Sequence, residues 1–522
     1  MQNQSFPTLR RVFGLRETVT ITVGTVIGVG LFTVGASVVG TLGAAVLLAT
    51  LVACLISIYP SLMYAEMSAA LPLSGGTYQY AKYGLGRPFG MLAGWNFIIS
   101  MVSVASGEAL AFSFYIRTLF EAIGIGLPVP DTVIAGVAVL LFLVLGIFGV
   151  EMTGKMQNAF LFFFWGVAVV WVFSMIPHLQ FGNFETPFAG LTGINFFQGV
   201  AMIWWCFAGF ETCCSLGEEI RHPQINLPRA LFLAPFIVFA VNGLFQWVLV
   251  CIVPPSGLAA IATAAAPYAE GMKTAGVIGF PLILLCLGIA FGGDFSTLNA
   301  SIVAPARYLV AMSRDGVLPR FFSYIHPKFR TPMVAVIIPG LITFALVLTN
   351  SVTFIASLSL FATLLYYVIG MCAACGLRKR HPELIRPYRV KGIWVLAPVS
   401  IAIYLLLMTQ LETEAVLLGV AWCALGLVLY TVSVLVGRRR RRNESARNAF
   451  PSPNAVLPSN AVSATPNTAP PPTLAELQKK MFPPPPTIEG KRKMDREYRI
   501  WKAVVFSACG IVLLLNLIFF LL

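Results

Sequence analysis

The chain has 522 residues, of which 58% are hydrophobic and only 11% charged, and its mean hydropathy is +0.83. Soluble domains carry roughly a quarter charged residues, so this composition excludes a soluble globular protein and predicts an integral membrane protein. The formal net charge is +14. We expect this charge to mark cytoplasmic loops, and we expect no nucleic-acid partner.

Windows of about 20 apolar residues predict twelve membrane spans and, after a long polar gap, a thirteenth. They lie near residues 19–40, 44–70, 90–119, 132–150, 156–177, 195–216, 231–253, 275–300, 333–350, 353–376, 393–411, 414–436 and 503–522. The N-terminus is polar and basic and leads directly into the first span. We therefore expect no cleavable signal peptide.

Positive charge is distributed unevenly between the two predicted sides. Of the 35 Lys and Arg residues, only Arg117 and Lys273 fall on one side. Because Lys and Arg favour cytoplasmic loops, the N-terminus and both ends of the twelve-span body are expected in the cytoplasm. The thirteenth span then places the extreme C-terminus outside, in a multi-pass protein of the cell membrane.

Composition divides the chain into four parts. These are an N-terminal segment (1–18), a twelve-span body (19–436), a basic, proline-rich linker (437–500) and a C-terminal transmembrane helix (501–522). The linker contains "RRRRR" and "PSPNAVLPSNAVSATPNTAPPPT". Such sequence buries no core, so we expect a disordered cytoplasmic linker in which "LAELQKK" forms at most a short helix.

Two spans carry glycines that would weaken a membrane helix. The first span contains "GTVIGVGLFTVG", with Gly28 and Gly30, and the sixth contains "WWCFAGFETCCSLGEEI", with Gly209. These spans begin two five-span halves, as in inverted-repeat transporters whose binding site lies between interrupted helices. Freed N–H groups of the first break would hold a carboxylate, and freed carbonyls of the sixth span an ammonium. The alternative is close helix packing, which the spacing of Gly24 and Gly28 also fits.

Several motifs resemble the amino acid-polyamine-organocation transporter superfamily. In chain order they are "GTVIGVGLF", "YAEMSAALPLSGGTYQYAKYGLGRPFGMLAGW", "FAGFE" with "GEEIRHPQINLPRA", "YLVAMSRDGVLP" and "RPYRVKG". The resemblance covers most of the twelve-span body. It implies an all-α polytopic membrane fold with a LeuT-like core of five plus five helices in an inverted repeat, and two further helices.

The same resemblance implies a substrate site at the two breaks. The backbone amides of Val29 and Gly30 would hold a substrate carboxylate, and the carbonyls of Val26 and Ile27 would face its ammonium. Trp205 matches an aromatic residue that closes over bound substrate in family members. The implied substrate-binding residues are Val26, Ile27, Gly28, Val29, Gly30, Trp205, Cys206, Phe207 and Ala208.

Two acids are candidates for ion coupling. Sodium-independent members often have a Lys at the start of the fifth span, and here the nearest match is Glu151, followed by Lys155. The eighth span adds Asp294. If Glu151 and Asp294 both approach the first span, they could hold a proton or a sodium ion. Alternatively, Glu151 lies at the inner mouth and pairs with Lys155.

Two further acids lie inside predicted spans. Glu211 either couples transport to protons, because loss of water disfavours its charged form, or serves packing and hydrogen bonding. Glu108 either faces the pocket and binds a cationic substrate group, or is a structural acid satisfied by hydroxyls such as that of Ser106.

The sequence thus predicts a secondary active transporter of amino acids that works by alternating access, proton-coupled or as an exchanger, with sodium as a competing ion. An amine or polyamine permease, or an amino acid sensor that does not transport, are the alternatives. No hydrolase triad, P-loop or metal-ligand spacing is evident, so we expect no enzyme, metal or cofactor. The loop "EAIGIGLPVPD" has no Cys, so no disulfide-linked heavy subunit is expected.

Overall fold

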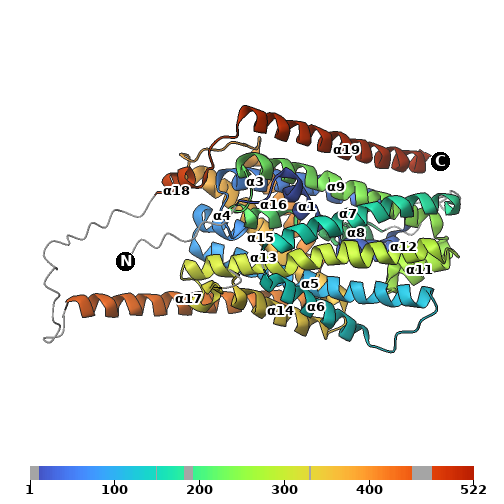
Figure 1. Cartoon of the computed structure of the whole chain (residues 1–522), viewed down its shortest axis with the longest axis horizontal. Coiled ribbons are helices and arrows are strands. Elements are labelled where there is room, and N and C mark those ends of the chain that lie inside the picture. Colours follow the sequence, from blue (N-terminus) through green and yellow to red (C-terminus); the bar gives the residue numbers. More distant parts are fainter. Residues whose placement is uncertain (1–10, 149, 181–191, 328–330, 450–472, 522) are drawn as a thin grey trace.

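The computed structural model describes residues 11–148, 150–180, 192–327, 331–449 and 473–521. These residues form a bundle of helices aligned along one axis (Figure 1). Nine described helices are long and apolar enough to cross a membrane, and three shorter apolar helices accompany them. The predicted all-helical polytopic membrane fold is confirmed.

The helices follow the predicted spans closely. The main helices up to residue 175 are α1 (Leu15–Gly24), η1 (Gly30–Gly35), α2 (Ala36–Leu42), α3 (Val46–Ala70), α5 (Arg87–Ala122), α6 (Asp131–Phe148) and α7 (Val150–Met175). Those between residues 193 and 380 are α8 (Gly193–Trp205), η5 (Phe210–Leu216), α9 (Pro223–Ile252), α12 (Phe280–Gly288), η7 (Ile289–Asp294), α13 (Phe295–Arg314), α14 (Met333–Val347) and α15 (Val352–Arg380). The remaining long helices are α16 (Ile393–Met408), α17 (Thr413–Ala449) and α19 (Ile488–Leu521), and the short ones are α4 (Gly76–Gly84), α10 (Leu258–Thr263), α11 (Pro267–Thr274) and α18 (Leu474–Met481).

Both predicted helix breaks are present. Helix α1 ends at Gly24, and helical structure resumes at Gly30 in the wide turns of η1. Helix α8 ends at Trp205, and the chain continues as the tighter η5 after Gly209, whose φ of +105° suits a residue without a side chain. The glycines of both spans therefore interrupt helices as well as allowing close packing.

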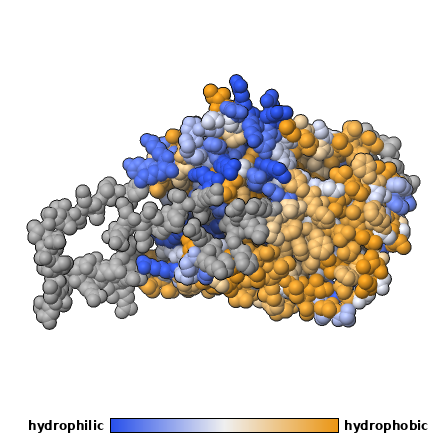
Figure 2. All heavy atoms as spheres, viewed as in Figure 1, coloured by the Kyte–Doolittle hydropathy of each residue, from blue (hydrophilic) through white to orange (hydrophobic). Residues whose placement is uncertain are grey.

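Charged residues gather at one end of the bundle, which we call the basic end. Figure 2 shows hydrophilic residues toward the end where α4 and α18 lie and a hydrophobic surface over much of the rest of this face. Ion pairs at the basic end include Lys82–Asp315 (2.6 Å), Arg307–Glu219 (3.0 Å), Arg386–Glu66 (3.4 Å) and Arg378–Glu66. They join helix ends that are distant in the sequence.

The segment after the twelve-span body is more ordered than predicted. Helix α17 continues to Ala449, α18 forms at residues 474–481 and α19 begins at residue 488. The short helix expected at "LAELQKK" is present as α18, whereas the prediction of disorder is wrong for 437–449 and 488–500; residues 450–472 lie outside the described part. A capping box of Thr473 and Glu476 explains why α18 starts where it does.

Helix α18 is fixed to the basic end through one buried side chain. The Gln478 amide nitrogen donates to the carbonyls of Ala70 (2.8 Å) and Ile385 (2.7 Å), and its oxygen accepts from the Ile385 N–H (3.0 Å). Arg11, before α1, donates to the Met481 carbonyl (2.6 Å). Local composition could not predict these contacts, because every partner lies outside the segment.

We expect Gln478→Ala to release α18 from the bundle. The substitution leaves the Ile385 N–H without its acceptor, and an unsatisfied buried group costs about 1–3 kcal/mol. Limited proteolysis with chymotrypsin should then cleave after Leu477 and Met481 much faster than in wild type. Lys480→Ala, on the exposed face of the same helix, is the control and should leave the rate unchanged. Equal rates in all three proteins would contradict the anchoring role of Gln478.

Candidate functional site

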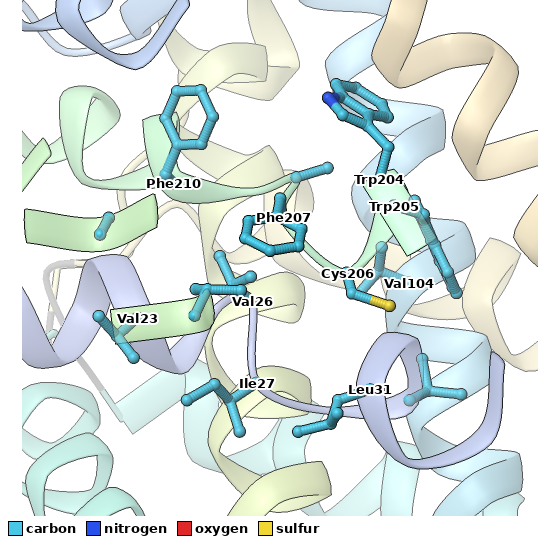
Figure 3. Packing of buried hydrophobic residues seen from close by; sticks show 14 of the residues in the cluster. Val23, Val26, Ile27, Leu31, Val104, Trp204, Trp205, Cys206, Phe207 and Phe210 are labelled. Atoms are coloured by element: carbon cyan, nitrogen blue, oxygen red, sulfur yellow. The ribbon is translucent and has the colours of Figure 1, made fainter. Parts of the chain in front are cut away.

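The two helix breaks lie against each other inside the bundle. The Thr25 hydroxyl donates to the Gly209 carbonyl (2.9 Å), and the Cys206 thiol to the Gly30 carbonyl (2.9 Å). A Cβ atom added at Gly30 would lie 3.4 Å from the Cys206 Cα. Figure 3 shows labelled residues of both breaks gathered in one place. The structure thus brings together the two segments that the sequence predicts to form one site.

A small buried cavity of about 20 Å³ lies beside the breaks. Its lining residues are Thr25, Val26, Val29, Gly30, Ser100, Met101, Val104, Glu108, Trp205, Ala208, Gly209 and Thr363. Of the predicted substrate-binding residues, Ile27, Gly28, Cys206 and Phe207 are not in this lining. A cavity of this size holds about one water molecule, so it is too small for an amino acid in this conformation.

Trp205 is held at the edge of this cavity by helix α15. Its indole N–H donates to the Ser359 hydroxyl (3.1 Å), and its side chain is almost completely buried. Ser100 and Thr363, which share a hydrogen bond of 2.6 Å, line the same cavity. A ring in this position covers the cavity on one side and connects the break after α8 to α15.

The amide predicted to hold a substrate carboxylate is occupied by a carboxylate of the chain itself. Both oxygens of Glu108, on α5, lie 2.9 Å from the Val29 nitrogen. A Cβ added at Gly28 would lie only 2.2 Å from one of these oxygens, so the glycine leaves room for the carboxylate. Ser106 instead donates to the carbonyls of Val102 (2.7 Å) and Thr343 (3.1 Å). Ser106 is therefore not the partner of Glu108, whose carboxylate is bound by the Val29 N–H instead.

Carbonyl groups of the first break are engaged by α13 rather than by the cavity. The Thr297 hydroxyl donates to the carbonyls of Gly24 (2.8 Å) and Ile27 (2.9 Å), and Ser296 also donates to that of Gly24 (3.2 Å). The Ile27 carbonyl thus has a hydroxyl partner in this structure, although the resemblance implied that it faces a substrate ammonium. Val26, by contrast, lines the cavity.

Gln157 on α7 is a polar residue that the sequence reasoning missed. Its amide nitrogen donates to Ser296 (2.7 Å), and its amide oxygen accepts from Asn299 (2.9 Å). A Cβ at Gly24 would lie 2.2 Å from that amide nitrogen, which explains the glycine. The signal in the sequence was a polar residue inside an apolar span. Glu151 lies in the first turn of α7, and its side chain is outside what the structure describes.

Glu211 is buried and bound by two tyrosine hydroxyls. Tyr366 and Tyr367 on α15 each donate to one of its oxygens, and Tyr367 also accepts from the Gly209 N–H (3.1 Å). These bonds fix the second break to α15. Of the two alternatives that the sequence leaves open for Glu211, this arrangement supports packing and hydrogen bonding.

Asp294, at the end of η7, is fully buried, and within the described part of the chain neither of its oxygens has a hydrogen-bond donor. Its neighbour is the carboxyl group of Glu108, close enough for the two acids to share a hydrogen bond when one of them is protonated. The structure therefore brings Asp294 to Glu108 at the first break, a pairing the sequence did not predict.

Comparison with known proteins identifies the family of this chain. The model of a family described as amino acid permease matches residues 13–435. An uncharacterized transporter of Mycobacterium tuberculosis is 29% identical over 85% of this chain and 97% of its own length. The branched-chain amino acid permease BcaP (25% identical; 81% and 92% covered) and the methylthioribose transporter (26%; 81% and 93%), both of Bacillus subtilis, are also similar. The chain belongs to the amino acid permease family, whose members are membrane transporters and not enzymes.

Proposed function

We propose that this protein is a secondary active transporter that moves an amino acid across the cell membrane by alternating access, with its basic end in the cytoplasm and its extreme C-terminus outside. The observation that supports this most is the pair of facing helix breaks beside a closed cavity. Backbone groups at such breaks bind small zwitterions because their N–H and carbonyl groups are not used by a helix.

The substrate we propose is an apolar amino acid. Val26, Met101, Val104 and Trp205 form an apolar part of the cavity lining, which suits an aliphatic side chain. Among the relatives, BcaP is named for branched-chain amino acids, whereas the methylthioribose transporter is named for a sugar derivative. The facing breaks and their backbone groups favour the zwitterion over the sugar.

The coupling ion we propose is the proton. Glu108 and Asp294 are buried, and neither of them pairs with a Lys, Arg or His residue that the structure describes. Acids inside a membrane that have no basic partner are expensive to keep charged and therefore suit proton binding. Glu151 stays a candidate from the sequence. Sodium is the competing ion, and the hydroxyls of Ser296 and Thr297 beside α1 would be its oxygen ligands.

Uptake by purified protein in liposomes tests this proposal. We expect labelled leucine, isoleucine or valine to accumulate when the outside is more acidic than the inside, with or without sodium. Putrescine and methylthioribose, included in the same panel, should not accumulate. Uptake that requires sodium would overturn proton coupling, and accumulation of putrescine alone would favour the amine permease.

Removal of residues 438–522 distinguishes a transporter from a sensor. A variant that ends at residue 437 retains the segment that matches the family, so we expect it to keep uptake within about twofold of wild type. Measurement in the same liposomes, at equal amounts of inserted protein, gives the comparison. A full-length protein that binds leucine without accumulating it under any gradient would instead support a sensor.

A further inference from the structure

The carboxylate of Glu108 occupies the place that the proposed function reserves for the substrate. Val29 precedes η1, so its N–H lies at the partly positive N-terminal end of that helical segment. A hydrogen bond from such an amide to a carboxylate is charge-assisted and strong. Glu108 makes two contacts of 2.9 Å there and also lines the cavity. A substrate carboxylate cannot reach the Val29 N–H while Glu108 holds it.

A displaced Glu108 would have no other charge partner nearby. Its charged neighbour in the described part of the chain is Asp294, an acid that itself lacks a hydrogen-bond donor. Tyr115 on α5 also interacts electrostatically with Asp294, but it donates its hydroxyl to the Phe32 carbonyl (2.6 Å). Moving a charged Glu108 off the amide would therefore place two carboxylates and the substrate carboxylate together without a cation.

We propose that Glu108 is an internal competitor of the substrate: the substrate carboxylate replaces it at the Val29 N–H, and Glu108 leaves the amide only after taking up one proton. The inference rests on the proposed function and names the group that links proton to substrate. On the outer side, one proton and one zwitterionic substrate bind together. On the inner side the substrate leaves, Glu108 releases the proton, and its carboxylate returns to the amide.

Competition for one amide also determines which compounds bind. An amino acid offers a carboxylate that can replace Glu108, whereas an amine of the same shape does not. Isoamylamine, which is leucine without its carboxylate, should therefore bind at least about a hundredfold more weakly than leucine. It lacks the carboxylate and so cannot form the charge-assisted hydrogen bond with the Val29 N–H. If isoamylamine binds as tightly as leucine, Glu108 binds the substrate amine and the proposal is wrong.

Equilibrium binding of labelled leucine between pH 5 and pH 8 tests the link to protons. In wild type, the affinity for leucine should fall about tenfold for each unit by which the pH rises. This holds over the pH range in which Glu108 is deprotonated before leucine binds and takes up a proton when it binds. Glu108→Gln has a neutral side chain at every pH and a weaker hold on the amide, so its affinity should vary less than twofold across this range. Glu121→Gln, at the exposed outer end of the same helix, is the matched control and should behave as wild type. Retention of the wild-type slope in Glu108→Gln, or its loss in Glu211→Gln instead, would overturn the proposal.

A second measurement does not depend on the substrate. Glu108→Ala removes one methylene group and the carboxylate, which together match acetate, and leaves the Val29 N–H free. Sodium acetate should raise the melting temperature of Glu108→Ala by about 2–4 °C relative to sodium chloride at equal ionic strength, and should leave wild type and Glu121→Ala unchanged. No specific shift in Glu108→Ala would show that the amide is not an anion site. If leucine fails to bind wild type while acetate gives this shift, the proposed amino acid substrate is wrong but the internal carboxylate site stands.

Discussion

Trp205→Ala is expected to lower uptake at least about tenfold while the protein still inserts into the membrane. The ring covers one side of a cavity of about 20 Å³ and its N–H is bound to Ser359 on α15. Without the ring, the cavity stays open to water and the second break loses one of its links to α15. Exclusion of water strengthens the polar contacts that hold a substrate. If water enters the cavity, both substrate binding and occlusion should therefore weaken. Initial uptake rates in liposomes, normalised to inserted protein, give the measurement.

Two further variants separate the covering role from the hydrogen bond. Trp205→Phe keeps an aromatic ring and loses the bond to Ser359, so it should retain a large part of the uptake. Trp394→Ala changes the same residue type at a site on α16 that is 60% exposed, and should have no effect on uptake. Near-normal uptake by Trp205→Ala would remove Trp205 as the cover of the site.

The sequence predicted features that depend on local composition. Long apolar windows identified the membrane helices, and the glycines around Gly28 and Gly209 identified both breaks, because a helix is weakened by its own residues. The ends of helices were less accurate. Helix α9 begins at Pro223 rather than near residue 231, since its first two turns are polar and fall outside an apolar window.

Partners across the bundle could not be predicted from the sequence. Glu108 was recognised as a candidate for the pocket, but its bond to Val29 depends on how α5 packs beside the first break. Gln157 was not predicted because an uncharged amide is a weaker signal in an apolar span than a charged residue. The charged Glu151, six residues earlier, is on a different face of the same helix. The docking of α18 through Gln478 likewise depends on residues hundreds of positions away.

Gly209→Ala is expected to reduce both thermal stability and uptake severely. Gly209 has a φ of +105°, which a residue with a side chain adopts only at a cost of about 1–3 kcal/mol. The added Cβ would also lie 2.9 Å from the Thr25 carbonyl oxygen, a backbone atom that cannot rotate away. The two breaks would have to separate, and the hydrogen bond from Thr25 to the Gly209 carbonyl would be lost.

A matched substitution shows whether the break itself is responsible. Gly166, in the middle of α7, has no heavy atom within 4 Å of the place where a Cβ would be added, so Gly166→Ala should be neutral or slightly stabilising. Melting temperature and uptake of both variants, measured in the same lipid, give the comparison. If Gly209→Ala melts and transports like Gly166→Ala, the second break needs neither its left-handed backbone nor its close approach to Thr25. The amide of Val29 would then have to be exposed to the cavity by the first break alone.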